Sequence, residues 1–288
     1  MPRNPADQID LIYGEVTQHA ARVYAHTPVP DISIRGHITG PFCAYSSTLP
    51  TTSEFRPVAT RNGSAAEVAV PDPCTWTPDL PATYKVRLEC RQADASLHCE
   101  QEIGLRTLGV RGRNLWFESK RWVLRGAFCT SVNGTDLSAW REAGAVMLVT
   151  DPDKSLLEAA SRVGVLLCVQ LSPQHNTHER RRQIAQYPAA ACLLMSAGTV
   201  HDWSKSQTPN LLAGQLLSAD EEPADWSDFI VLPVDEPRRF AEQARALDRP
   251  VIASRQLASP QEIHRARAAC DDLQRTLAPH IDLAGYVV

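Results

Sequence analysis

The stretch GLRTLGVRGRNLWFESKRWVLRGAF, residues 104–128, decides how the chain is organised. Gly104–Thr107 closes a run of alternating strands. Two apolar segments, Leu115–Phe117 and Trp122–Leu124, then flank the polar tip Glu118–Lys120, a pattern that predicts a β-hairpin. Because another apolar segment follows the hairpin directly, a second domain is predicted to begin there with a buried strand.

The part of the chain before this stretch has the pattern of an all-β domain. Short alternating segments follow one another between prolines, glycines and serines, and no segment keeps a helical period. Several short strands with frequent turn signals predict a β-sandwich over residues 1–110. The predicted strands are Asp31–Gly40, Phe42–Ser46, Glu67–Val70, Tyr84–Glu89 and His98–Leu108.

The part after the hairpin alternates short apolar runs with amphipathic stretches, which predicts βα units and a parallel sheet. Eight strands of this kind predict a closed (β/α)8 barrel of the TIM type, and the last helix is expected to be missing. A doubly wound open sheet is the competing topology, but neither a GxGxxG motif nor a P-loop motif supports it. The predicted strands are Val123–Phe128, Val146–Val149, Val165–Leu171, Cys192–Ser196, Leu211–Leu217, Phe229–Leu232, Val251–Ser254 and Leu283–Val287. The predicted helices are Leu137–Ala143, Ser155–Val163, His178–Gln186, Pro237–Leu247 and Pro260–Leu277.

Composition excludes several classes of protein. A chain of 288 residues can hold two domains with separate cores. Its 43% hydrophobic and 22% charged residues are typical of a soluble globular protein, and a net charge of −4 argues against nucleic-acid binding. No apolar run reaches membrane-spanning length, and the N-terminus MPRNPADQID has no apolar signal segment. We therefore expect a cytoplasmic protein that binds neither nucleic acid nor membrane.

Eight cysteines are spread along the chain, with no CxxC pair and no zinc-type spacing to histidine. Most lie in apolar runs, which predicts buried free thiols. Cys90 and Cys99 could face each other across a hairpin, so a disulfide between them is the alternative in an oxidising compartment. We expect no bound metal and no cofactor.

Several segments resemble glycoside hydrolase family 2, the β-galactosidase and β-glucuronidase group. Gly104–Thr107 and the hairpin after it resemble the GFRT-like turn and the hairpin of the form LNGKPVFLRG that join two domains in this family. Trp76–Tyr84 resembles the LWSPENPYLY turn, and Ile12–Val16 is similar to the GIYRDV segment that ends the family's sugar-binding jelly roll. Tyr187–Pro188 and Arg249–Ile252 resemble the HPSV and KPII segments of two barrel strands.

This resemblance implies an immunoglobulin-like β-sandwich at residues 1–110, a hairpin junction at 111–122 and a TIM-type barrel at 123–288. The chain would then begin where the jelly roll has already ended. The resemblance also implies that the ligand is a carbohydrate, with another protein domain as the alternative partner.

The same resemblance implies where the catalytic residues should lie. In this family the acid is the glutamate of an Asn-Glu pair after the fourth barrel strand, and the nucleophile is a glutamate that ends the seventh. This chain has Val200 and Arg255 at those positions. Valine carries no proton, and arginine is neither a nucleophile nor a usable base. Val149–Asp151 and Val169–Gln170 also replace the family's Arg-Thr-x-His and Asp-Glu groups. The resemblance therefore implies a catalytically degenerate relative.

Relocated carboxylates would instead make the protein a divergent glycosidase. Asp235 and Glu236 follow the sixth strand, Asp151 follows the second, and Glu221–Glu222 lie after the fifth. Adjacent carboxylates usually point apart, so Glu236 before a proline is better explained as the start of a helix. Asp153 has the pattern of an N-cap.

Other residues in the loops after the strands could line a binding pocket. Trp203 and Trp226 would offer aromatic faces for sugar stacking, although partial burial against the barrel rim explains them better. Arg255 could instead pair with Asp235 or Glu236. The predicted ligand-binding residues are Gln170, His175, His201, Asp202, Trp203 and Arg255.

A third hypothesis is metal-assisted chemistry through loop histidines. His175, His178 and His201 lie on the predicted active face, although surface exposure explains such histidines as well. Cys129 and Ser131 end the first strand, and no pattern pairs them with a base.

Overall fold

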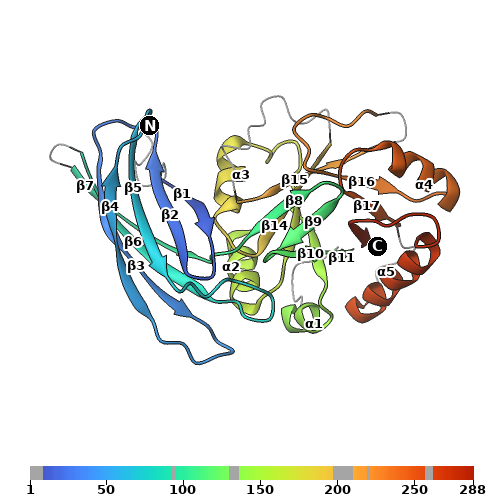
Figure 1. The fold of residues 1–288 in the computed structure, drawn as a ribbon, viewed down its shortest axis with the longest axis horizontal. Helices are drawn as coiled ribbons and strands as arrows, with labels where there is room; N and C mark the ends of the chain where they lie inside the picture. The colour runs from blue at the N-terminus through green and yellow to red at the C-terminus, as the bar shows by residue number, and fades with distance from the viewer. Residues whose placement is uncertain (1–8, 93–94, 130–135, 197–209, 219–220, 257–261) are drawn as a thin grey trace. The chain divides into compact units, whose positions relative to one another are not determined.

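The computed structural model describes residues 9–92, 95–129, 136–196, 210–218, 221–256 and 262–288 (Figure 1). The chain divides into two compact units. Met1–Arg106 with Gln186–Pro188 form the first, and Thr107–Ala185 with Ala189–Val288 form the second. The first unit holds an antiparallel sheet, and the second holds a closed barrel of eight strands. The predicted fold class, a β-sandwich followed by a (β/α)8-type barrel, is confirmed.

The first unit is one antiparallel sheet that folds over on itself, with the strand order β1-β2-β5-β4-β3-β6-β7. The turning point is β4, because Thr51–Phe55 pairs with β3 while Arg56–Val58 pairs with β5. A strand that changes partners in this way joins two sheets into a sandwich. The strands are β1 (Asp10–Val16), β2 (Ala20–Thr27), β3 (Ser33–Phe42), β4 (Thr51–Val58), β5 (Ser64–Pro71), β6 (Thr83–Gln92) and β7 (Ala95–Ile103).

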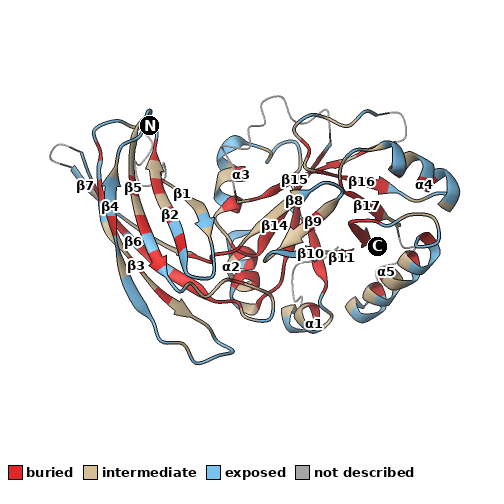
Figure 2. Cartoon of the chain, in the orientation of Figure 1, coloured by how far each residue is buried: buried red, intermediate tan, exposed pale blue. Residues whose placement is uncertain are grey.

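Alternate residues of these strands fill one core, which is red in Figure 2. Ile34 and Ile38 of β3 and Val86 and Leu88 of β6 are buried in it, as expected for residues an even number of positions apart on a strand. Burying an aliphatic side chain of this size contributes about 1.5–3 kcal/mol. The hydrophobic effect therefore holds the two halves of the sheet together.

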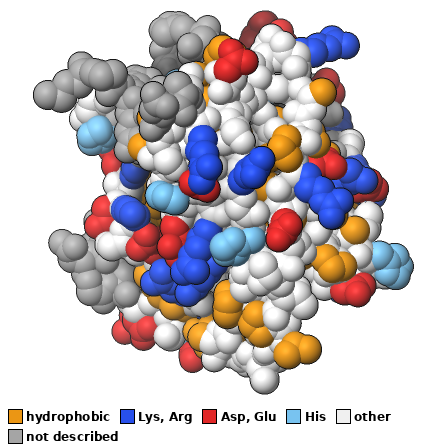
Figure 3. Space-filling view, turned by 90° about the vertical axis from the view of Figure 1, so that its left-hand side faces the viewer, with side chains coloured by type: hydrophobic (Ala, Val, Ile, Leu, Met, Phe, Trp, Pro, Cys, Tyr) orange, Lys and Arg blue, Asp and Glu red, His pale blue; other side chains and the backbone are white. Residues whose placement is uncertain are grey.

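The outer face of β6 and β7 carries charges of both signs. Arg87 on β6 pairs with Glu100 on β7 at 3.3 Å, and Arg91 pairs with Glu89 at 2.8 Å. Figure 3 shows basic, acidic and histidine side chains beside one another on this side. Exposed ion pairs contribute little to stability, so this face is a solvated surface.

Several expectations for the sandwich need correction. β1, β2 and β4 were not predicted, and β4 was missed because its sequence TTSEFRPV is mostly polar and buries Phe55 alone. Ile12–Val16 lies within β1, which pairs with β2. Phe42–Ser46 is not a separate strand, since β3 ends at Phe42 and a loop follows. His98–Leu108 is divided between β7 and β8.

The predicted hairpin is present in the second unit. Glu118 and Ser119 form its turn with φ values of 47° and 61°, as a two-residue type I′ turn requires. The N–H and the hydroxyl of Thr107 both donate to Glu118 Oε1, at 2.5 and 3.1 Å, so the turn before the hairpin is tied to its tip. The strands of this small sheet are β8 (Leu108–Arg111), β9 (Asn114–Phe117) and β10 (Lys120–Trp122).

The barrel consists of eight parallel strands, each hydrogen-bonded to the next. The first strand, β11, pairs with both β12 and β18, which closes the ring and excludes the open doubly wound sheet. Each predicted strand lies within two residues of the observed one. The strands are β11 (Leu124–Phe128), β12 (Val146–Thr150), β13 (Leu167–Gln170), β14 (Ala190–Ser196), β15 (Leu212–Leu216), β16 (Phe229–Pro233), β17 (Val251–Ser254) and β18 (Gly285–Val287).

Three helices of the barrel begin at carboxylate caps, two of which, Asp153 and Glu236, were predicted. Asp136, Asp153 and Glu236 are N-caps whose carboxylates accept hydrogen bonds from backbone N–H groups of the first turn. The helices are α1 (Leu137–Glu142), α2 (Lys154–Val163), α3 (His178–Ala185), α4 (Pro237–Ala246) and α5 (Ile263–Leu277). In the described part of the chain, none of them has the length and apolar character needed to cross a membrane.

Helix α5 covers the place where the barrel closes, because it packs on both β11 and β18. Arg125 on β11 reaches out to Asp271 at 3.2 Å and to Gln274 at 2.6 Å. The thiol of Cys270 lies 3.2 Å from the carbonyl oxygen of Gly126. Polar and apolar contacts of α5 therefore hold the first and last strands under one helix.

The described part of the segment between β15 and β16 contains no helix. Two polar side chains of the barrel hold its backbone instead. Gln215 donates to the carbonyl of Glu222 at 3.2 Å and accepts from the N–H of Ala224 at 2.7 Å. Arg249 donates to the carbonyls of Ala224 and Ser227 at 2.9 and 3.1 Å. Gln215 is fully buried, so these bonds satisfy a side chain that water does not reach.

Gly214 on β15 provides a test of the close packing inside the barrel. A Cβ atom there would lie 2.3 Å from the ring of Phe229 and 2.7 Å from Leu194. We expect Gly214→Ala to lower the free energy of unfolding by about 1–3 kcal/mol, because the ring must move or the strands must separate. Urea denaturation followed by tryptophan fluorescence measures the change. Gly109→Ala on β8 is the control, since its Cβ meets no atom within 4 Å. Equal losses in the two variants would contradict this packing.

Candidate functional site

The carboxyl ends of the barrel strands, called the rim below, collect the predicted site residues that the structure describes. Asp151 follows β12, Gln170 ends β13, His175 lies in the loop after β13, and Arg255 follows β17. Because all strands of the barrel are parallel, these residues lie at the same end of it. The predicted site residues Ser131, Val200, His201, Asp202 and Trp203 lie outside the described residues.

The direction of one side chain shows which residues point into the barrel. Arg125 on β11 contacts the outer helix α5, so its neighbours Leu124, Gly126 and Phe128 point inward. Residues paired across neighbouring strands point to the same side of the sheet, so the register of each strand pair shows which residues of the next strand face inward. Followed around all eight strands, the registers return to β11 with the same residues facing inward. Gly214 provides a check, because its missing side chain would meet Phe229 and Leu194, which the registers also place inside.

The last inward-facing residue of each strand forms what we call the rim ring. None of its members has an ionisable side chain. Phe128 is 45% exposed, and the amide of Gln170 and the hydroxyls of Thr150 and Ser254 stand around the same ring. The rim therefore presents an aromatic face and neutral hydrogen-bonding groups. The members of the rim ring are Phe128, Thr150, Gln170, Ser196, Leu216, Pro233, Ser254 and Val287.

Asp151 and His175 form a polar cluster just beyond the rim ring. Asp151 Oδ2 lies 3.1 Å from His175 Nδ1, and Asp151 Oδ1 accepts the backbone N–H of Ser172 at 3.1 Å. Ser172 Oγ lies 3.2 Å from the same His175 Nδ1. Burial alone would raise the pKa of Asp151, but the hydrogen bonds from Ser172 and His175 outweigh it and hold the pKa below its ordinary value.

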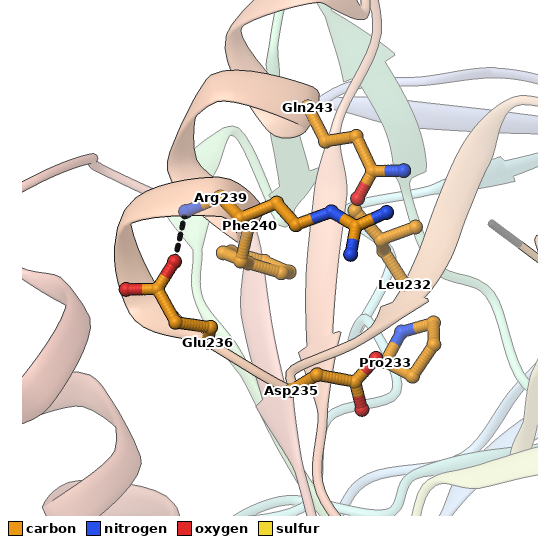
Figure 4. Close-up of a pocket in the computed structure, with 7 residues that line it drawn as sticks. All are labelled: Leu232, Pro233, Asp235, Glu236, Arg239, Phe240 and Gln243. Carbon is orange, nitrogen blue, oxygen red and sulfur yellow. Dashed lines mark hydrogen bonds between the residues drawn. The ribbon is translucent and has the colours of Figure 1, made fainter.

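Asp235 and Glu236 line a small pocket between β16 and α4 (Figure 4). The lining includes both the outward-facing Leu232 and Pro233 of the rim ring, so the pocket lies at the edge of the barrel wall beside α4. Its volume is about 70 Å³, which holds a few waters but no sugar. Glu236 accepts the N–H groups of Arg238 and Arg239 at 3.1 and 2.8 Å, and these bonds lower its pKa. Its role as the start of a helix is confirmed.

Arg255 directly follows β17. Its backbone N–H donates to the carbonyl of Val287 at 2.9 Å, which fixes the residue beside the rim ring. The side chain is half-buried. Among the described residues it forms no ion pair with Asp235 or Glu236, so the alternative that it pairs with them is not found.

Trp226 lies at the opposite end of the barrel from the rim. It precedes the first residue of β16, and the nearby Asp228 donates its N–H to the carbonyl of Ala213 at the start of β15. Trp226 therefore offers no stacking face to the rim, and the expectation that it does is wrong. His178 is an exposed residue at the start of α3. Within the described ranges no group of three His, Cys, Asp or Glu side chains could hold a metal ion.

All eight cysteines are free thiols, as predicted, but only four of them are buried: Cys90, Cys168, Cys192 and Cys270. Cys90 pairs in register with Leu97, and Cys99 pairs with Leu88, so the two cysteines are diagonal rather than opposite. Diagonal Cα atoms are about 7–8 Å apart, too far for a disulfide. Cys168 and Cys192 are direct neighbours inside the barrel, where burial raises the pKa of Cys168 and leaves it unreactive.

Comparison with solved structures identifies the architecture. A glycosyl hydrolase family 2 member from Bacteroides cellulosilyticus superposes with a TM-score of 0.66 and 15% identity, over 98% of this chain and 43% of that one. The β-glucuronidase of Parabacteroides merdae superposes with a TM-score of 0.62 and 11% identity, over 97% of this chain and 46% of its own. The β-D-glucuronidase of Dictyoglomus thermophilum superposes with a TM-score of 0.62 and 13% identity, over 97% of this chain and 61% of its own. No family model matches the sequence, and no curated protein sequence does.

This chain has the sandwich-and-barrel fold of glycoside hydrolase family 2. Identities of 11–15% establish the fold and nothing finer, and the chain spans about half the length of the structures it matches. The resemblance of the junction and of the barrel-strand segments to family 2 is therefore confirmed for the fold. What the rim of this family 2 fold does has to be inferred from its own residues.

Sequence reasoning missed most of the rim ring of this family 2 fold. Phe128, Thr150 and Ser254 were treated as ends of strands rather than as site residues. Their alternation within apolar runs was visible, but which alternate set faces inward depends on the contact of Arg125 with α5. A closed parallel barrel is covered on its outside, so both faces of each strand are apolar and the pattern alone does not separate them.

The lowered pKa of Asp151 predicts a pH dependence of stability. A carboxyl whose pKa is lower in the folded state stabilises the fold above its unfolded pKa, about 3.9, and loses this effect as the pH falls through the folded value. We therefore expect Asp151→Asn to reduce the free energy of unfolding by about 1 kcal/mol at pH 6, and by less at pH 3. Urea unfolding at both pH values measures this difference. The exposed Asp225→Asn is the control, and an equal difference at both pH values would contradict the hydrogen bonding of Asp151.

Proposed function

We propose that the chain binds carbohydrate at the rim of the barrel and does not hydrolyse glycosidic bonds. The observation that carries this proposal is the rim ring, which combines an exposed aromatic side chain with neutral hydroxyl and amide groups and has no ionisable member. A retaining glycosidase needs two carboxyl groups about 5 Å apart, one as acid and one as nucleophile. The rim ring supplies neither.

Two of the described carboxylates beside the rim ring, Asp151 and Glu236, have structural partners. Asp151 accepts the N–H of Ser172 and faces His175, and Glu236 caps α4. Their lowered pKa values keep both ionised at neutral pH, so neither has a proton to give to a leaving oxygen. Arg255 at the family's nucleophile position and Val200 at its acid position support the same conclusion. The protein is then a non-catalytic relative, a pseudoenzyme of the family 2 fold.

The rim ring suits a sugar better than a charged or purely apolar ligand. A pyranose presents an apolar C–H face and an edge of hydroxyl groups. Phe128 offers an aromatic face to the first, and Thr150, Gln170 and Ser254 offer donors and acceptors to the second. The similar structures are named as glucuronidases and a family 2 hydrolase, which makes carbohydrate the ligand class to test first.

Phe128 is the residue whose loss should weaken sugar binding most. We expect Phe128→Ala to reduce the affinity for a methyl β-D-pyranoside about tenfold, because one aromatic contact is worth about 0.5–1.5 kcal/mol and 1.4 kcal/mol is a factor of ten. Saturation-transfer NMR with the methyl glucoside, galactoside, mannoside and glucuronide measures binding. Tyr45→Ala is the matched control, since Tyr45 is 49% exposed but belongs to the sandwich.

Hydrolysis is tested separately with p-nitrophenyl β-glycosides of the same sugars. The wild type should release no nitrophenol above the rate of buffer. Turnover that disappears in Asp235→Asn or Glu236→Gln would replace this proposal with a divergent glycosidase. Wild-type protein that binds none of the pyranosides would remove the carbohydrate assignment.

A further inference from the structure

The hydrogen bonds around His175 determine which of its ring nitrogens carries a proton. Asp151 Oδ2 lies 3.1 Å from His175 Nδ1, within hydrogen-bonding distance. An ionised carboxylate repels the lone pair of an unprotonated Nδ1 and attracts its N–H, so we place the proton on Nδ1, with Ser172 Oγ as a second acceptor beside it. The lowered pKa of Asp151 keeps this carboxylate ionised near neutral pH. In the neutral imidazole, Nε2 is then left with a lone pair and no proton.

The backbone holds this arrangement in place. Asp151 has φ 48°, in the left-handed region that aspartate tolerates better than most residues. Its N–H donates to the carbonyl of Gln170 at 3.0 Å, which joins it to the end of the neighbouring strand. The N–H groups of His175 and Asn176 both donate to the carbonyl of Ser172 at 3.0 Å and form the turn that carries the imidazole. Two adjacent barrel strands therefore position the Asp151–His175 pair.

The imidazole is open to solvent on its far side. The side chain of His175 is 59% exposed, whereas that of Asp151 is 25% exposed. Ser172 Oγ lies 3.2 Å from Nδ1, the nitrogen that already faces Asp151. A serine nucleophile would have to face Nε2 instead, so this cluster is not a catalytic triad. No described residue bonds Nε2, which leaves this atom for a ligand.

We propose that His175 is a binding residue that accepts a hydrogen bond from a ligand hydroxyl through Nε2, and that Asp151 is the positioning residue that fixes its tautomer. This inference rests on the proposed carbohydrate binding and adds to it the group that His175 recognises, a ligand hydroxyl with a proton to donate. Ring hydroxyls of a neutral pyranoside meet this requirement because each has a proton to donate.

The tautomer can be measured without any ligand. Long-range ¹H–¹⁵N NMR of the imidazole at pH 8 reports which nitrogen is protonated. We expect the wild type to show His175 with the proton on Nδ1, and Asp151→Asn to move the population toward Nε2, because an amide can donate to Nδ1 as well as accept from it. A wild-type imidazole protonated on Nε2 would overturn the inference whatever the protein binds.

Two substitutions of His175 separate its two nitrogens in a binding assay with methyl β-D-glucopyranoside. His175→Gln places an amide near the position of Nε2 and retains an acceptor there. His175→Asn is shorter, so its amide retains contact with Asp151 but does not reach the ligand. We expect affinity to fall five- to tenfold in His175→Asn and to be largely restored in His175→Gln. His178→Asn, an exposed histidine in the same segment, is the control and should bind as the wild type does.

The outcomes distinguish this inference from the proposed function. Wild-type binding that is unchanged in His175→Asn overturns the role of His175 and leaves carbohydrate binding standing. Equal losses in His175→Asn and His175→Gln overturn the acceptor role. Absence of wild-type binding to any of the four pyranosides overturns the proposed function, and this inference with it.

Discussion

The pairing of β11 with both β12 and β18 is the constraint on which the rest of the second unit depends. Once the first and last strands are joined, all eight carboxyl ends lie on one ring, and residues far apart in sequence become neighbours. Helix α5 covers this closure through Arg125 and Cys270. The site is therefore a product of closure, since Phe128, Gln170 and Ser254 have no reason to meet in an open sheet.

A barrel of this kind supplies positions rather than chemistry. In this chain the positions on the rim ring are neutral, and two nearby carboxylates, Asp151 and Glu236, accept hydrogen bonds from backbone N–H groups. Glu236 caps a helix because Pro237 starts the helix and the N–H groups of the first turn need an acceptor. The hydrogen bonds from these N–H groups lower the pKa of Glu236, so it stays ionised and has no proton to transfer. Asp151 is similar, except that its second oxygen faces a histidine and so shapes a possible ligand contact.

Much of this architecture could be predicted from the sequence. The hairpin tip at Glu118, the caps at Asp153 and Glu236, and the strand Val251–Ser254 are local features, and neighbouring residues are enough to specify them. The sandwich was harder to predict. β4 is polar along most of its length and is a strand because β3 and β5 lie on either side of it, which is tertiary context rather than propensity.

The candidate site also has features that the sequence determines and features that depend on tertiary contacts. The sequence by itself determined that Val200 carries no proton and that Arg255 is neither a nucleophile nor a usable base, because these properties follow from the residue type alone. Only the tertiary structure decided which alternate residues face the barrel interior, that Trp226 lies at the wrong end, and that Asp151 meets His175. These are contacts between segments brought together by barrel closure, and no local pattern of apolar and polar residues encodes them.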